Sequence, residues 1–162
     1  MESIEIKKVS EENLEMFAKL IKDSRLKEDF QFSEELPIIE GLRKLVVNPV
    51  RNIFYSLING EPCGFVNLFY PKNEERNHLA IVQAIQIVPT FRGRGVGSHL
   101  LQYALDQIKK DGKKLVTLEV VDANERAVNL YKNKKFKIYG NLPNSFIKDG
   151  KNYATLSMYL EL

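Results

Sequence analysis

The feature that most constrains this chain is a glycine-rich run between an apolar segment and an amphipathic one. Residues 79–88 are almost wholly apolar, which is typical of a central strand buried on both faces. From position 100 to 108, apolar residues recur at helical spacing. Between the two segments lies the run VPTFRGRGVGS, residues 88–98. Because glycine allows a tight turn, this pattern predicts a buried strand that turns sharply into a helix.

The same run predicts a binding site for a strongly anionic ligand. The start of a helix offers unpaired backbone N–H groups and the positive end of the helix dipole. Arg92 and Arg94 add two permanent positive charges, and their forked donors suit phosphate oxygens. A pyrophosphate is therefore the expected ligand, and a strand-to-helix turn without a ligand is the alternative.

Two familiar nucleotide motifs fit the run less well. A P-loop requires a lysine after its glycines, and no lysine follows here. A dinucleotide-binding fingerprint requires G-x-G-x-x-G, whereas Gly93, Gly95 and Gly97 form G-x-G-x-G. Glu119 and Asp122 nevertheless lie roughly where that motif places its ribose-binding acid. A dinucleotide-binding protein therefore stays open as an alternative.

The remaining hydrophobic pattern predicts an α/β fold with a mixed sheet and helices packed on it. The order of elements is one strand, two helices, three strands, and then helix, strand, helix and two strands. Asn59-Gly60 predicts a hairpin, and Asp149-Gly150 predicts another turn. The strands are expected at residues 3–7, 53–58, 63–69, 79–88, 115–121, 136–139 and 153–162. The helices are expected after Ser10 and Ser33, over 100–108, and from Asn124 to Tyr131.

Length and composition predict one cytoplasmic domain over residues 1–162. A chain of 162 residues matches the ~100–200 residues of a single domain. The single cysteine and two histidines predict neither a disulfide nor a metal site. No apolar stretch reaches the ~20 residues that span a membrane, and no secretion signal is present. With a net charge of only +3 and no run of five basic residues, no nucleic-acid partner is expected.

Two segments together resemble the GNAT superfamily of acetyl-CoA-dependent N-acetyltransferases. Residues 92–97, RGRGVG, match its R-x-x-G-x-G signature. Residues 124–131, NERAVNLY, followed by Phe136, are similar to its N-x-x-A-x-x-L-Y helix and the strand after it. The resemblance implies a twisted, mixed and mostly antiparallel sheet of about seven strands, with helices on both faces.

The resemblance also implies a position for each part of acetyl-CoA. In this family the strand before the loop splays from its neighbour and pairs with pantetheine, which assigns that role to Ile87 and Val88. The loop and the helix start bind the pyrophosphate. Asn124 matches a position that contacts the pantetheine arm, with a simple helix cap as the alternative. The residues expected at the pyrophosphate are Arg92, Arg94, Gly95, Val96, Gly97 and Ser98.

The implied reaction is direct attack of a neutral amine on the acetyl carbonyl. Tyr131 matches a tyrosine near the thioester sulfur, so it is the expected general acid. A backbone N–H near Ile87 or Val88 is expected to polarise the carbonyl. Many family members carry a carboxylate on the strand before the loop, but this chain has Gln83 and Gln86 there. An amide is no base, so Glu119 on the next strand and a chain of water molecules are the two candidates.

The acceptor is a primary amine of a small molecule or peptide, and its identity stays open, as does transfer of a longer acyl group. Four acidic residues, Glu28, Asp29, Glu34 and Glu35, flank Phe30 and Phe32 and predict a site for a cationic amine. The residues from Gly140 to Asn152 are expected to form another pocket wall. A non-catalytic acyl-CoA-sensing module on the same fold is the main alternative, because the strand carboxylate is missing. A homodimer is compatible with the resemblance.

Overall fold

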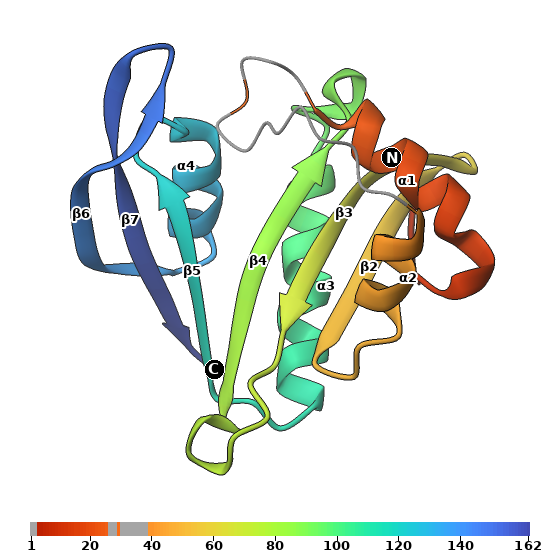
Figure 1. Cartoon of the computed structure of the whole chain (residues 1–162), viewed down its shortest axis with the longest axis horizontal. Helices are drawn as coiled ribbons and strands as arrows, with labels where there is room; N and C mark the ends of the chain where they lie inside the picture. The colour runs from red at the N-terminus through yellow and green to blue at the C-terminus, as the bar shows by residue number, and fades with distance from the viewer. Residues whose placement is uncertain (1–2, 26–28, 30–38) are drawn as a thin grey trace.

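The computed structural model describes residues 3–25, 29 and 39–162, and these residues form a seven-stranded sheet with helices on both faces (Figure 1). The strand order is β1-β2-β3-β4-β5-β7-β6. All neighbouring strands are antiparallel except β4 and β5, so the predicted mixed, mostly antiparallel sheet is confirmed. The strands are β1 (Ile4–Lys8), β2 (Arg51–Ile58), β3 (Glu61–Phe69), β4 (Leu79–Ile87), β5 (Leu115–Val121), β6 (Lys137–Lys148) and β7 (Lys151–Glu161). The helices are α1 (Leu14–Asp23), α2 (Ile39–Val46), α3 (Val96–Lys110) and α4 (Glu125–Asn133).

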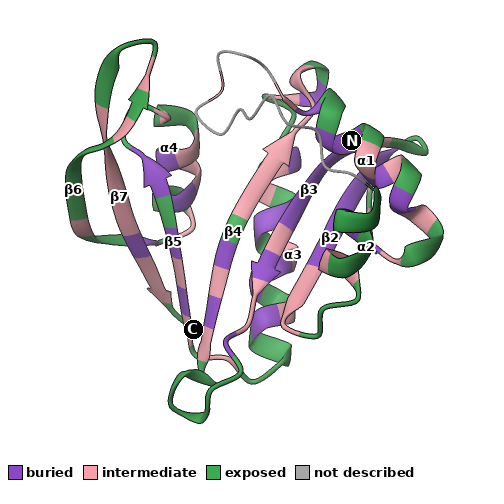
Figure 2. Cartoon of the chain, viewed as in Figure 1, coloured by how far each residue is buried: buried purple, intermediate pink, exposed green. Residues whose placement is uncertain are grey.

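Each face of the sheet carries its own apolar core. On one face, α3 and α4 cover the sheet through residues such as Leu101 and Val128. On the other face, α1 and α2 pack on β2 and β3 through residues such as Phe17 and Leu42. Figure 2 shows buried residues along β2 and β3 and mostly exposed residues along β6. No helix in the described part of the chain is long and apolar enough to cross a membrane.

The parallel strands β4 and β5 pair over only part of their lengths. Leu79–Val82 pairs with Leu115–Leu118, and the two strands then diverge (Figure 1). Their divergence coincides with a break in the register between β3 and β4, which leaves Gln83 without a partner on β3. Such an extra residue bends its strand. The sheet therefore opens into a split between the carboxyl-terminal halves of β4 and β5.

Two predicted turns are confirmed by their backbone angles. Asn59 and Gly60 join β2 to β3 with φ values of 52° and 81°. Asp149 and Gly150 join β6 to β7 with φ values of 51° and 73°. Positive φ at both central residues is the geometry of a tight two-residue hairpin, and asparagine, aspartate and glycine accept it most easily.

The predicted short strand over residues 136–139 is wrong in its extent. β6 runs from Lys137 to Lys148, and it pairs with β7 along most of that length. Pro143 suggests an interruption, because proline cannot donate to a ladder. In the structure it lies within a register break between Leu142 and Phe146, so the strand resumes beyond it. The residues from Gly140 to Asn152, expected as a pocket wall, therefore lie mostly in the hairpin of β6 and β7.

Candidate active site

The glycine-rich run forms a tight loop that ends at the start of α3. Gly93 and Gly95 have φ values of 81° and 82°, which L side chains rarely adopt. The N–H groups of the first helical turn, from Val96 to Ser98, have no acceptor within the helix. No acidic side chain lies in that turn. Gly95, Val96, Gly97 and Ser98 line a cavity of about 730 Å³, so the predicted anion-binding loop borders a hollow of the protein.

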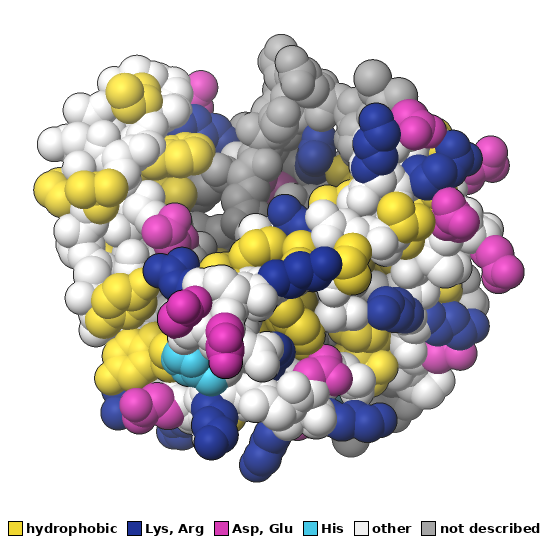
Figure 3. All heavy atoms as spheres, turned by 60° about the horizontal axis from the view of Figure 1, so that its bottom comes forward, with side chains coloured by type: hydrophobic (Ala, Val, Ile, Leu, Met, Phe, Trp, Pro, Cys, Tyr) yellow, Lys and Arg dark blue, Asp and Glu magenta, His cyan; other side chains and the backbone are white. Residues whose placement is uncertain are grey.

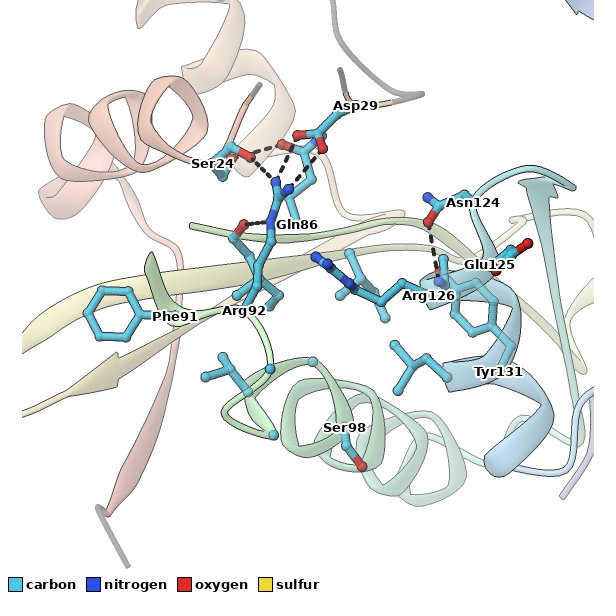
Figure 4. Close-up of a pocket in the computed structure, with 18 of the residues that line it drawn as sticks. Ser24, Asp29, Gln86, Phe91, Arg92, Ser98, Asn124, Glu125, Arg126 and Tyr131 are labelled. Atoms are coloured by element: carbon cyan, nitrogen blue, oxygen red, sulfur yellow. Dashed lines mark hydrogen bonds and ion pairs between the residues drawn. The ribbon is translucent and has the colours of Figure 1, made fainter. Parts of the chain in front are cut away.

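The cavity lies between the end of β4, the glycine loop and the start of α4 (Figure 4). Its β4 wall consists of Ile85, Gln86 and Ile87, and its α4 wall includes Leu130 and Tyr131. These walls belong to β4, which forms one side of the split, and to α4, which follows β5 on the other side. A ligand held by the loop could therefore extend along β4 into the split.

The backbone at the end of β4 presents its polar groups to the split at Ile87 and not at Val88. The Val88 amide donates to the Cys63 carbonyl at 2.9 Å, so this pair is a hydrogen-bonded pair of the β3–β4 ladder. In such a ladder the adjacent pair, Gly64 and Ile87, points its N–H and C=O groups away from each other. The Ile87 peptide groups therefore face the β5 side, where β5 has diverged.

The Arg92 guanidinium binds the protein itself at four points. Its Nε donates to the Ile87 carbonyl at 3.0 Å, and one Nη2 hydrogen bond reaches the Ser24 carbonyl at 3.0 Å. The two Nη atoms bind both carboxylate oxygens of Asp29, at 2.9 and 2.8 Å (Figure 4). Arg92 still lines the cavity, but these contacts were not foreseen, because Asp29 lies 63 positions earlier in the chain.

Other arginines are placed differently. Arg94 lies over the ring of Phe91, 5.0 Å from its centroid, and is not among the residues that line the cavity. Arg25 and Arg126 do line the cavity, and Arg126 extends from α4 into the space beside the loop (Figure 4). Sequence reasoning gave these two arginines no role, because only the folded chain brings α1, α4 and the loop together.

Asn124 stands at the start of α4 and lines the cavity. Its side-chain oxygen accepts a hydrogen bond from the Ala127 amide at 3.2 Å, which is the geometry of a helix cap. Its amide nitrogen can still donate to a ligand, because the cap uses only the oxygen. The two expectations for Asn124, a cap and a cofactor contact, are therefore compatible.

Tyr131 lies in the wall of the cavity, with only 5% of its surface exposed. Its ring packs edge-on against Phe136, with the centroids 5.8 Å apart. Burial disfavours the phenolate and raises the pKa of Tyr131 to about 12. The hydroxyl therefore keeps its proton throughout the neutral range.

Glu119 and Tyr131, the two predicted catalytic residues, lie on opposite faces of the sheet. Leu118 and Val120 belong to the core that contains Tyr131, and side chains alternate along a strand. Glu119 instead lines a second hollow of about 1130 Å³, together with Gln83. Because Val82 and Leu118 form the last pair of β4 and β5, Gln83 and Glu119 stand where the split begins.

Tyr139 and Tyr159 form another side of this second hollow, with their rings edge-on and 5.9 Å between centroids. Tyr139 is 62% exposed.

On the face of the protein that Figure 3 shows, acidic and basic side chains are interspersed, with hydrophobic ones between them. That surface shows no continuous stripe of basic side chains.

The two glutamines of β4 have different surroundings. The Gln86 side chain accepts a hydrogen bond from the Ser24 hydroxyl at 2.9 Å, next to the end of α1 (Figure 4). Gln83 is exposed in the second hollow. Gln86 is therefore occupied in joining β4 to α1, and Gln83 is the glutamine that a ligand on the Glu119 side would meet.

Of the acidic cluster predicted near the acceptor, only Asp29 lies among the described residues, and it binds Arg92. Glu28, Phe30 and Phe32 lie outside them, as do Glu34, Glu35 and the helix cap expected at Ser33. Within the described ranges, no three side chains of the metal-ligating types gather in one place.

Comparison of the sequence with known families gives a match to the acetyltransferase (GNAT) family over residues 14–136. An uncharacterized N-acetyltransferase of Methanocaldococcus jannaschii is 36% identical over 86 residues, which cover 52% of this chain and 38% of that protein. An uncharacterized N-acetyltransferase of Archaeoglobus fulgidus is 26% identical over 133 residues, covering 79% of this chain and 89% of the relative. The chain thus spans well under half of the first relative and most of the second.

Solved structures match nearly the whole fold. An N-acetyltransferase from Staphylococcus aureus superposes with a TM-score of 0.85 at 19% identity, covering 98% of each chain. A protein from Salmonella typhimurium, solved with its cofactor acetyl-CoA, gives 0.84 at 15% identity, covering 98% of this chain and 94% of its own. At such identities these likenesses establish the fold. The family match covers most of the sequence, and the chain belongs to the GNAT family of acetyltransferases.

Proposed function

We propose that this protein is an N-acetyltransferase that moves the acetyl group of acetyl-CoA to a primary amine by direct attack. The observation that carries the proposal is the split between β4 and β5. The anion-binding loop and Tyr131 border it on one face of the sheet, and Glu119 stands at its start on the other face. Acetyl-CoA then enters the split from one face of the sheet and the acceptor amine from the other. The two meet at the thioester, which lies in the split.

The cofactor side is assigned to the 730 Å³ cavity. The N–H groups from Gly95 to Ser98 bind the pyrophosphate at the positive end of α3. The Ile87 carbonyl, which faces the split, accepts a hydrogen bond from the pantetheine arm with the lone pair that Arg92 leaves unused. Arg126 is positioned to add a positive charge from α4.

The chemistry is assigned to three groups around the split. The Ile87 N–H polarises the acetyl carbonyl as the amine attacks. Glu119, directly or through a water molecule, accepts the proton that the amine loses. Tyr131 donates a hydrogen bond to the departing sulfur, and its high pKa keeps that proton available at neutral pH.

The acceptor side is assigned to the hollow of about 1130 Å³. Glu119 and Gln83 provide a carboxylate and an amide at its inner end. The tyrosine pair, Tyr139 and Tyr159, offers aromatic faces that suit an ammonium group or an apolar body. Residues 1–162 are proposed to act as one domain, because both sites are built from a single sheet.

The test begins with a calorimetric titration of the purified protein with acetyl-CoA, with NAD as the control ligand. A panel of primary amines is then screened by release of the free thiol of CoA. In the active reaction, we expect Tyr131→Phe and Glu119→Gln to lower kcat about 100-fold, the usual scale of general acid–base catalysis. Both variants keep acetyl-CoA affinity within about twofold, because neither side chain binds the pyrophosphate.

Tyr103→Phe and Glu61→Gln are the matched controls, since both residues lie outside the two hollows. They should leave kcat unchanged. A protein that binds acetyl-CoA but releases no thiol with any amine is a non-catalytic acyl-CoA-binding module. A protein that binds NAD and not acetyl-CoA belongs to the dinucleotide-binding class, and the proposal is then refuted.

A further inference from the structure

The Arg92–Asp29 ion pair gives the first arginine of the glycine loop an unexpected task. A guanidinium has five N–H groups, and four of those of Arg92 already donate to the Ile87 carbonyl, the Ser24 carbonyl and the two Asp29 oxygens. Both side chains of the ion pair are largely shielded, with 20% and 28% of their surfaces exposed. Arg92 is thus held as a structural cation, with a single N–H group left over.

The contact of Arg92 with Ile87 bears directly on the split. The Ile87 carbonyl faces the side from which β5 has diverged, so no strand partner fixes it there. The Arg92 Nε supplies that missing partner at 3.0 Å. The orientation of the last peptide of β4 therefore depends on where the guanidinium sits, and Asp29 sets that position through two parallel hydrogen bonds.

Asp29 is itself attached to the opposite side of the split. The Lys148 ammonium, at the end of β6, donates to the Asp29 backbone carbonyl. Asp29 thus contacts the β4 arm of the sheet through Arg92 (Figure 4) and the β6–β7 arm through Lys148. This one residue joins the two arms that the loss of β4–β5 pairing leaves apart.

We propose that Asp29 is a positioning residue: it holds Arg92 on the Ile87 carbonyl and so orients the end of β4 to receive the pantetheine of acetyl-CoA. Arg92 then contributes to cofactor binding through the protein backbone and not as a ligand of the pyrophosphate. The inference rests on the proposed function only in taking acetyl-CoA as the ligand of the cavity.

Arg92 either positions the end of β4 or binds the pyrophosphate. The two roles predict different effects of its loss on ligands with and without pantetheine. The probes are acetyl-CoA and 3′-phospho-ADP, which is the nucleotide half of CoA and lacks pantetheine. A positioning role predicts that Asp29→Asn and Arg92→Gln each raise the Kd of acetyl-CoA about tenfold, the effect of losing one charge-assisted contact network. The Kd of 3′-phospho-ADP then stays within about twofold.

If the Arg92 side chain instead binds the pyrophosphate, its loss should weaken both ligands. Arg92→Gln then weakens 3′-phospho-ADP as much as acetyl-CoA, and Asp29→Asn strengthens both, because it releases the guanidinium. Either result overturns the proposal, and so does a Kd of acetyl-CoA that neither variant changes. Arg51→Gln serves as the control that removes one positive charge elsewhere, since Arg51 stacks on Phe69 outside both hollows, and it should leave both Kd values unchanged.

Two further measurements separate positioning from mere folding. Hydrogen exchange at the end of β4 in the ligand-free protein should rise in Asp29→Asn and return to the wild-type rate in Asp29→Glu, which keeps the charge. Arg92→Lys should behave as Arg92→Gln, because an ammonium cannot reach Ile87 and both Asp29 oxygens at once. Unchanged exchange in Asp29→Asn contradicts the inference. A wild-type protein that binds acetyl-CoA without turnover refutes the transferase and leaves this inference intact.

Discussion

Replacing Gly64 by alanine tests how tightly β3 and β4 pack beside the split. An added Cβ would lie 2.6 Å from the Ile87 Cδ1 atom, 2.8 Å from the Gln86 carbonyl oxygen and 3.2 Å from the Leu100 Cδ1 atom. The Ile87 methyl group can rotate away. The Gln86 oxygen belongs to the β-ladder, so it moves only if the strands separate.

Overpacking of this kind costs about 1–3 kcal/mol. With a value of ~2 kcal/mol and a change of ~2–4 °C per kcal/mol for a protein of this size, Tm should fall by about 6 °C. Urea unfolding followed by circular dichroism measures the free energy of unfolding, and calorimetry measures Tm. Because the displaced atoms belong to Gln86 and Ile87, the variant should also bind acetyl-CoA more weakly.

Gly41 provides the matched control. It lies in α2, and an added Cβ would meet nothing within 4 Å. Gly41→Ala should therefore raise stability by about 0.5–1 kcal/mol, since glycine disfavours a helix interior. The reasoning fails if Gly64→Ala is as stable as the wild type, or if both variants lose stability equally.

Three further predictions concern the loop, the α4 cap and the buried tyrosine. Gly95→Ala should cost ~1–2 kcal/mol in urea unfolding, because it forces a side chain into the left-handed region, and Gly95→Asn should cost less; equal costs would contradict this. Asn124→Ala should cost about 1 kcal/mol through the lost cap, whereas Asn124→Asp, which keeps an acceptor, should restore it. The raised pKa of Tyr131 stabilises the fold fully below pH 10, the usual tyrosine value, and that contribution is lost as the pH rises toward 12. Stability measured from pH 8 to 12 should therefore fall less steeply in Tyr131→Phe, and an identical profile would show that Tyr131 does not titrate as the structure implies.

Local sequence patterns predicted the turns and helix starts around the site, because the conformation of each is determined by residues adjacent in the sequence. The left-handed glycines of the loop and the α4 start at Asn124 arise from local backbone geometry. The hairpin at Asn59-Gly60 has the same kind of origin. The predicted extent of β6 was wrong because the strand is extended by its pairing with β7. That pairing accommodates Pro143 at a register break.

Within the site, residue types were easier to predict than their contacts. The residues from Gly95 to Ser98, predicted to bind a pyrophosphate, border the cavity. Arg92 was expected to bind phosphate because of its charge, yet its contacts are with Asp29, Ser24 and Ile87. No local pattern distinguishes an arginine that binds a ligand from one that binds a distant carboxylate.

The sequence by itself determined the family, the glycine-rich loop and the helix that carries Tyr131, because these follow from short-range spacing of glycines, apolar residues and caps. The tertiary structure alone decided which groups meet. It placed Glu119 and Tyr131 on opposite faces of the sheet and ended the β4–β5 pairing at Val82 and Leu118. It also brought Asp29 to Arg92 across 63 positions. The physical reason is that such contacts depend on strand register and on packing between distant segments, which no short window of residues contains.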